Sequence, residues 1–398
     1  MNGNRSRGPR LRILLHAQHL TGVGHFVRMR EIARALALQH DVYLVDAGRP
    51  VPGVAVTGAI PIELPRIIRN DNRLAPLAGD ADIAATLAER RSILCSAISR
   101  LRPDVLVVEH YPFSKWELQD EIEAAIVTAR TANVRARVLG SVRDIVRQTR
   151  HESCTGAVYV ERVLGALQAG FDALLVHGDP ALTQLGDHFP GTGSIRIPVE
   201  YTGIVSEIPR HGQSGAQAIN QLTGGSPFVL ASVGGGPDAQ GLLVQCVHAW
   251  RLLMAQDALP GWQVVICTGL ASPPGKLRAL AAAEGAGRVV VQPFNPDYLA
   301  WLETAQLSVS CAGYNTCANL LQLRRRALLV PDAQMSDQPE RARFLAARGI
   351  ATVIDPQQLD ARGLATAIRT ALAISPPRHD IAMDGAERTR AIIERLAG

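Results

Sequence analysis

The chain alternates short apolar runs with longer segments in which apolar residues recur at helical spacing. In the first half, the apolar runs predict strands at 11–17, 41–46, 105–109, 137–142 and 173–177, and the helical spacing predicts helices at 26–39, 83–101 and 117–132. In the second half, strands are predicted at 228–233, 263–268, 289–292, 307–310, 327–330 and 351–354. Helices are predicted there at 241–255, 275–283, 298–304, 315–323, 338–348 and 361–373. This alternation is typical of an α/β protein with parallel sheets.

Residues 205–226 separate the two series of strands and helices. They are rich in Gly, Ser, Gln and Pro and show no apolar period, which predicts a linker. We therefore expect a loose tail at 1–10, an N-terminal Rossmann-like domain at 11–204, a linker at 205–226 and a second Rossmann-like domain at 227–375. A last helix within 376–398 is expected to pack back toward the first domain. Ligands of parallel sheets bind at the carboxyl ends of the strands, so both sheets should face a central cleft.

Composition narrows the class of protein. Of 398 residues, 47% are hydrophobic and 19% charged, which excludes a chain that is disordered throughout. The net charge of +5 is scattered and aromatic residues are only 4%, so a nucleic-acid-binding surface is not expected. The six cysteines lack zinc spacing, and no apolar run reaches the ~18 residues needed to cross a bilayer. We expect a cytoplasmic protein with reduced thiols and no metal. Peripheral membrane contact and the oligomeric state stay open.

A Gly-x-Gly-His motif follows the first predicted strand. Gly22 and Gly24 permit a tight turn, and the N-terminus of the following helix attracts negative charge. His25 stands at the mouth of this helix, where a histidine can act as a general base. The alternative is a loop histidine packed on the sheet.

Two further strands of the first half end in polar residues. Glu109 and His110 end the strand at 105–109, and Glu109 could orient a neighbouring imidazole or simply face solvent. Arg143 and Asp144 stand where the strand at 137–142 runs out, and they could simply pair with each other.

The second half carries two glycine turns. Gly234, Gly235 and Gly236 end the strand at 228–233 and could offer N–H groups to a phosphate or sugar oxygen, or form only a flexible turn. The stronger signal is the segment 311–316, Cys-Ala-Gly-Tyr-Asn-Thr, where a strand runs into a helix. Gly313 is expected to need a positive φ. The N–H groups of the next three residues could then hold a diphosphate.

One more helix opens on a polar pair. Asp337 and Gln338 follow the strand at 327–330, and Gln338 could bind sugar hydroxyls. Asp337 could do the same or serve only as an N-cap.

Taken in order, these motifs resemble those of a known family. The order is GxGH, SVGGG, Pro-Phe at 293–294, SCAGYNT at 310–316, Val-Pro at 330–331 and Asp-Gln at 337–338. The chain resembles the GT-B glycosyltransferases related to the UDP-N-acetylglucosamine transferase that makes lipid II. It looks most similar to the bacterial "predicted glycosyltransferase" group with GLGH-type and GGYNT-type motifs. The resemblance covers roughly residues 11–375.

The resemblance implies a function and a set of site residues. It implies two Rossmann-like domains and inverting sugar transfer without an essential metal or other cofactor. The donor would be a nucleotide sugar, with a UDP-sugar such as UDP-N-acetylglucosamine favoured, and the acceptor a hydroxyl or amine on an unidentified molecule. His25 would be the base, assisted by Glu109 or Asp144, with Gly22, Gly24, His110 and Arg143 on the acceptor side. Donor-binding residues would be Gly234, Gly235, Gly236, Thr268, Pro293, Phe294, Gly313, Tyr314, Asn315, Thr316, Asn319, Asp337 and Gln338.

One position departs from the family pattern. The family carries a Glu that accepts both ribose hydroxyls, and alignment on the AGYNT segment places Asn319 there. Asn keeps one acceptor oxygen but lacks the charge, so Asn319→Glu is expected to tighten UDP-sugar binding. Two other functions remain open: a nucleotide-sugar hydrolase that uses water as acceptor, and an inactive protein that binds a sugar nucleotide.

Overall fold

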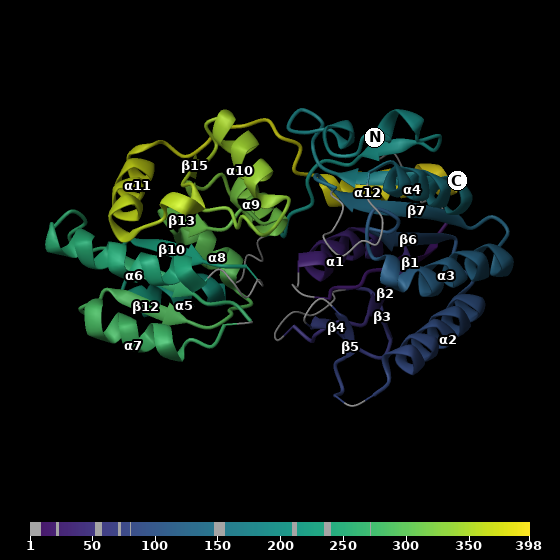
Figure 1. Cartoon of the computed structure of the whole chain (residues 1–398), viewed down its shortest axis with the longest axis horizontal. Helices are drawn as coiled ribbons and strands as arrows, with labels where there is room; N and C mark the ends of the chain where they lie inside the picture. The colour runs from purple at the N-terminus through teal and green to yellow at the C-terminus, as the bar shows by residue number, and fades with distance from the viewer. Residues whose placement is uncertain are drawn as a thin grey trace, which may run out of the picture.

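The structure is a computed structural model of the whole chain and describes residues 9–20, 24–51, 58–70, 73–79, 81–146, 156–208, 213–234, 240–270 and 272–398. Two parallel sheets, each with helices on its faces, form two domains that lie side by side (Figure 1). This confirms the α/β class.

The first domain is built on a seven-stranded sheet in the order β3-β2-β1-β6-β7-β8-β9, and every neighbouring pair is parallel. Its strands are β1 Arg12–His16, β2 Asp41–Asp46, β3 Ile60–Glu63, β6 Val105–Glu109, β7 Arg137–Arg143, β8 Ala173–His177 and β9 Val199–Tyr201. Its helices are α1 Gly24–Ala37, α2 Ile83–Leu101, α3 Gln119–Ala132 and α4 Gly156–Gly170, and an antiparallel hairpin adds β4 Ile67–Asn70 and β5 Arg73–Pro76.

Both faces of this sheet are covered. Leu14 of β1 packs with α2, α3 and α4, while its neighbours Ile13 and Leu15 pack with α1 on the other face. This alternation puts successive side chains into two different cores, which explains the almost continuous apolar runs of the central strands.

The second domain has a six-stranded parallel sheet in the order β12-β11-β10-β13-β14-β15. Its strands are β10 Phe228–Ser232, β11 Gln263–Cys267, β12 Val289–Gln292, β13 Leu307–Ser310, β14 Ala327–Leu329 and β15 Thr352–Val353. Its helices are α5 Gln213–Thr223, α6 Gln240–Ala255, α7 Gly275–Glu284, α8 Tyr298–Thr304, α9 Tyr314–Gln322, α10 Gln338–Ala347 and α11 Ala361–Ala373.

Strand order reverses once in each sheet, between β1 and β6 and between β10 and β13. Chain connections diverge to opposite sides at such a point and leave a crevice beyond the strand ends, where ligands of α/β sheets bind. The polar motifs of the sequence follow these four strands, β7 and β14, so the topology gathers them at the carboxyl ends of the strands of the two sheets.

The chain passes between the domains twice. It leaves the first domain after β9 and returns to it before α12 Gly385–Ala397, which packs on α1 (Figure 1). The two passages are hydrogen-bonded to each other: Ile204 N donates to Ala382 O over 2.8 Å, and Gly385 N donates to Ile204 O over 3.1 Å. A Cβ on Gly385 would lie 2.6 Å from the Ile204 backbone, so this contact requires glycine.

Several elements were not predicted from the sequence. Helix α5 occupies much of the segment 205–226, which we predicted to be a linker, and it packs against α8. Gly215 permits this packing, because its Cβ would lie 2.9 Å from Ala300. Helix α4, strands β3 and β9, and the β4–β5 hairpin were also missed. None of the helices in the described parts of the chain is long and apolar enough to span a membrane.

Candidate active site

The N-termini of α1 and α9 meet where the two domains touch. The Asn315 Nδ2 amide donates a hydrogen bond to the Gly24 carbonyl over 2.9 Å. Neither helix has an acidic residue in its first turn. Two positive helix ends therefore face one region without acidic residues of their own to offset them.

His25, at the start of α1, is held by Glu109 at the end of β6. Its Nδ1 lies 2.8 Å from Glu109 Oε1, so Nδ1 carries the proton and donates to the carboxylate. Burial and then the Arg143 cation lower the pKa of His25 to about 3. His25 is thus neutral at neutral pH, and its Nε2 is an unprotonated acceptor. The side chain keeps 24% exposure, which leaves it reachable.

Glu109 is completely buried among cations. Arg28 and Lys115 both form ion pairs with it, in addition to its contact with His25. Burial alone would raise the pKa of this carboxyl group, but its interaction with His25 and the charges of Lys115 and Arg28 bring the pKa well below the usual value. Glu109 therefore stays ionised and orients His25; it does not itself accept a proton at neutral pH.

His110 completes a small cluster beside His25. The two rings meet edge to face with centroids 4.9 Å apart, and burial lowers the pKa of His110 well below its usual value. Ligand atoms of His25, Glu109 and His110 lie within 4.8 Å of one another, a spacing that could admit a metal ion. Arg28, Lys115 and Arg143 all act on these groups electrostatically, and three cations so close disfavour a divalent ion.

Arg143 and Asp144 do not pair with each other. Asp144 binds Arg341 of the second domain through two hydrogen bonds of 2.8 Å each, and both side chains are buried. Asp144 is thereby committed to the domain interface, at odds with the predicted part in proton transfer. Arg143 lies over the ring of Tyr314, 5.7 Å from its centroid.

On the other side of the interface, the predicted sugar-binding pair is engaged by the protein. Asp337 binds the same Arg341 over 2.8 Å. Gln338 Oε1 accepts hydrogen bonds from the backbone N–H groups of Ala312 and Asp332, both over 3.0 Å, and so fixes the turn before α9.

The turn before α9 differs from expectation in one respect. Gly313 has φ −64° and ψ 152°, an extended conformation open to any residue, so the expected positive φ is wrong. A Cβ on Gly313 would come no closer than 3.9 Å to Thr316 Oγ1. The absence of a side chain here leaves open space beside the first N–H groups of α9.

Tyr314 joins the domains from the first position of α9. Its hydroxyl donates to His177 O over 2.9 Å and accepts from Val205 N over 3.1 Å. Burial raises the pKa of this phenol to about 12, so it remains protonated.

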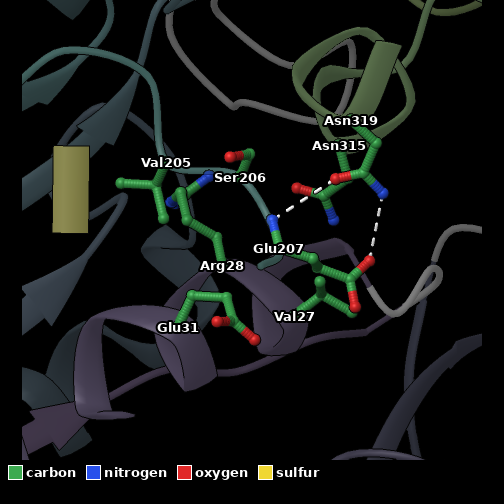
Figure 2. A pocket seen from close by; sticks show the side chains of 8 residues that line it. All are labelled: Val27, Arg28, Glu31, Val205, Ser206, Glu207, Asn315 and Asn319. Atoms are coloured by element: carbon green, nitrogen blue, oxygen red, sulfur yellow. Dashed lines mark hydrogen bonds between the residues drawn. The ribbon is translucent and has the colours of Figure 1, made fainter. Parts of the chain in front are cut away.

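Asn319 contacts the protein instead of an open ribose site. Its Nδ2 donates to Glu207 Oε1 over 3.1 Å, and its Oδ1 accepts from Glu207 N over 3.3 Å (Figure 2). Glu207 also binds Arg30 of α1 over 2.7 Å. A hollow of about 150 Å³ lies beside these residues; α1, the first interdomain passage and α9 line it.

The remaining predicted donor residues lie elsewhere on the second sheet. Among the described residues, no hydrogen bond joins Thr268, Pro293 or Phe294 to the groups around His25. Gly234 lies near Gly269, at the ends of β10 and β11. Gly22, Gly235 and Gly236 lie outside the described residues.

Four charged residues of the site were not predicted from the sequence: Arg28, Lys115, Glu207 and Arg341. Each acts on a partner from a different element, at sequence separations from 6 to 197 residues. The available signal was weak, because a charged residue on a short helix usually faces solvent. For Arg28, the only hint was its place one turn after His25.

Comparison with known proteins agrees with this architecture. The kitacinnamycin glycotransferase superposes with a TM-score of 0.62 at 18% identity, covering 98% of this chain and 100% of the other. MurG of Acinetobacter baumannii superposes with a TM-score of 0.57 at 14% identity, covering 97% and 100%. The fold is therefore that of the GT-B glycosyltransferases.

The sequence comparisons identify the second domain. Residues 230–396 match the glycosyltransferase family 28 C-terminal domain. The UDP-N-acetylglucosamine–N-acetylmuramyl-(pentapeptide) pyrophosphoryl-undecaprenol N-acetylglucosamine transferase of Desulforudis audaxviator (strain MP104C) is 32% identical over 190 residues, or 43% of this chain. The match spans about half, 49%, of that relative's length. Residues 230–396 are thus similar to the family 28 C-terminal domain, and the whole chain has a GT-B fold.

Proposed function

We propose that the protein is an inverting, metal-independent glycosyltransferase that moves a sugar from a nucleoside diphosphate to a hydroxyl or amine of an acceptor. The observation that carries the proposal is a contact between the two predicted motifs: Gly24, the first residue of α1 and the neighbour of His25, accepts a hydrogen bond from Asn315 in the first turn of α9. A base and a diphosphate-binding turn on opposite domains are what a direct displacement needs. UDP-sugars are the favoured donors, since the relative's name specifies an N-acetylglucosamine transfer with a UDP donor.

The reaction would proceed in one displacement. The acceptor O–H or N–H gives its proton to His25 Nε2 as its oxygen or nitrogen bonds to the anomeric carbon. The bond from that carbon to the diphosphate oxygen breaks, and the electron pair leaves with the nucleoside diphosphate. N–H groups at the start of α9 stabilise the charge that develops there. Attack from the face opposite the leaving group inverts the configuration.

Glu109 supports this step without taking a proton. It fixes the His25 tautomer and favours the imidazolium that forms as the proton arrives. The hollow beside Asn319 is too small to hold a sugar nucleotide, so we expect the domains to separate to admit one.

The proposal is tested with UDP-, TDP-, GDP- and CDP-sugars, first by thermal shift. A ligand that binds only the folded protein raises the midpoint by mass action. The stabilising donor is then incubated with and without an acceptor panel, in the presence of a chelator. Glycosylated product with the inverted linkage supports the proposal. Free sugar and nucleoside diphosphate at turnover rates without acceptor would show a hydrolase, and binding without turnover across the panel would show a binding protein.

A further inference from the structure

Arg143 is a cation without a counter-ion at the centre of the interface. In the part of the chain that the structure describes, its guanidinium has no hydrogen bond or ion pair, and its Nε is shielded from solvent. The neighbouring cations are all neutralised: Arg28 and Lys115 bind Glu109, and Arg341 binds Asp144 and Asp337. A partly buried charge without an ion-pair partner lowers the stability of the fold. We therefore infer that the unpaired cation of Arg143 is there to bind an anionic ligand.

The position of Arg143 says where this anion would lie. A Cβ placed on Gly24 would lie 3.3 Å from an Nη of Arg143 and 3.1 Å from Asn315 Nδ2. The guanidinium, the Asn315 amide and the start of α1 therefore meet at one point, next to the start of α9. All these groups donate hydrogen bonds, and a guanidinium fork matches phosphate oxygens in geometry.

We propose that Arg143 binds a phosphate group of the donor's diphosphate and, through this contact, makes His25 a stronger proton acceptor when donor is bound. This inference rests on the proposed function and names a residue of the first domain that binds the nucleotide held by the second. Tyr314 supports the guanidinium from its ring face.

The coupling to His25 follows from charge. The charged groups that act on His25 are Glu109 at the end of β6, Lys115 beyond it and Arg143 of β7. The ring of His110 packs against His25, and Arg28 of the same helix binds the carboxylate of Glu109. After burial, Arg143 is the largest cause of the lowered pKa of His25. A phosphate dianion on Arg143 offsets that charge, so the pKa of His25 rises toward its ordinary value and the imidazole becomes a stronger base.

The test compares Arg143→Gln with Arg143→Lys, which keeps the charge, and with Arg135→Gln, which removes an exposed arginine outside the interface. Calorimetry with UDP, uridine and inorganic pyrophosphate measures binding. We expect Arg143→Gln to weaken UDP and pyrophosphate binding by at least tenfold, because it removes charge-assisted hydrogen bonds to a phosphate, and to leave the binding of uridine, which has no phosphate, unchanged. The Lys variant keeps the charge but loses the fork, so its affinity should lie between those of the Gln variant and wild type. Arg135→Gln should bind UDP as tightly as wild type.

A second readout is the pH profile of kcat/KM, which reports the free enzyme. Without Arg143, the acid limb should move to higher pH, and Lys should restore it. Should the Gln variant fail to fold, UDP binding to the wild type in acid solution should still take up protons, and His25→Gln should abolish this uptake.

The outcomes separate this inference from the proposed function. Equal loss of UDP and uridine binding, unchanged UDP affinity in Arg143→Gln, or no linked proton uptake would overturn the role of Arg143 even if sugar transfer is demonstrated. Pyrophosphate binding that depends on Arg143, without any sugar transfer, would support the anion site and overturn the proposed function.

Discussion

At the scale of single residues, the ionised carboxylate of Glu109 determines which nitrogen of His25 carries the proton. Glu109 has two cations of its own, Arg28 and Lys115, so it can hold the His25 proton at Nδ1 without losing its charge. Only Nε2 of His25 is then left to accept a proton. His25 thus accepts the proton, and Glu109 orients the imidazole ring of His25.

We predict that His25→Ala reduces turnover by roughly 10²–10⁴-fold, the usual effect of removing a general base, while donor affinity stays nearly unchanged. Since the loss is confined to the transition state, kcat and kcat/KM should fall together. His248→Ala is the matched control, because His248 makes a similar 2.8 Å contact with Glu284 in the second domain. Turnover within about threefold of wild type would remove His25 from the mechanism.

A second prediction concerns Gly313. Its extended φ and the open space around its Cα mean that Gly313→Ala should fold with wild-type stability. The added methyl group would nevertheless occupy space beside the N–H groups that begin α9, so UDP affinity should fall by about tenfold, or ~1.4 kcal/mol. Chemical unfolding and calorimetry on the same preparation check both parts. Unchanged UDP affinity would show that no phosphate approaches this turn.

At the scale of elements, α9 is tied to the first interdomain passage through Asn319 and Glu207. This contact reverses the direction expected from sequence for Asn319→Glu. A second carboxylate would face Glu207 instead of a ribose, and like charges in contact repel each other.

We therefore predict that Asn319→Glu lowers the free energy of unfolding by about 1 kcal/mol, since Glu207 is partly exposed, and weakens UDP binding. The double variant Asn319→Glu with Glu207→Gln should recover most of the stability, because it restores one amide facing one carboxylate. Urea titration of the wild type and the two variants measures this. If Asn319→Glu is as stable as wild type and binds UDP more tightly, the interpretation from sequence, that Asn319 contacts the ribose, would be supported instead.

Elements with a strong apolar period could be predicted from sequence, and others could not. The predicted strands at 105–109, 173–177 and 307–310 agree with β6, β8 and β13 residue for residue, because buried parallel strands are continuous apolar runs. Helix α5 was missed, since its sequence is mostly Gln, Ala and Gly and its fit depends on Gly215 lying against α8. Such a contact between distant segments leaves no local pattern.

The same distinction holds for the site. Turns after strands could be located from sequence because the chain direction fixes where parallel strands end. Ion-pair partners could not: sequence left Arg143 and Asp144 open to pairing with each other, whereas Asp144 binds an arginine 197 positions away. Which cation is left unpaired is therefore a property of the folded molecule alone.

At the scale of the whole molecule, buried histidines make the fold sensitive to acid. The pKa of His25 is lowered to about 3, and those of His110 and His177 well below 6.5, with burial the main cause in each. The unfolded chain binds protons on these groups below pH ~6.5 and the folded chain does not, so stability falls as pH falls through that range. Glu109 and Asp337, whose pKa values are also lowered, add to the loss below pH ~4.5.

We predict that the free energy of unfolding is about 4 kcal/mol lower at pH ~5.5 than at pH ~7.5, since each of the three histidines contributes up to ~1.4 kcal/mol over the one pH unit below its unfolded pKa. Urea titrations at the two pH values measure it, with His25→Gln expected to reduce the difference by roughly a third. A stability that is flat between these pH values would contradict the neutral state of the three imidazoles.

The paired interdomain passages limit how the cleft can open. The two connecting segments are hydrogen-bonded to each other, through Ile204 on one and Ala382 and Gly385 on the other. They therefore form one hinge made of two strands of backbone. A single flexible connection would let the domains rotate in any direction relative to each other. Two adjacent connections restrict that rotation to one axis. Each closure would then bring Asn315 back to Gly24, and Arg341 back to Asp144, in the same register. The path of the backbone between the domains thus aligns the site residues of one domain with those of the other in the same way at each closure. Helix α12 fixes the end of the second connection on the first domain.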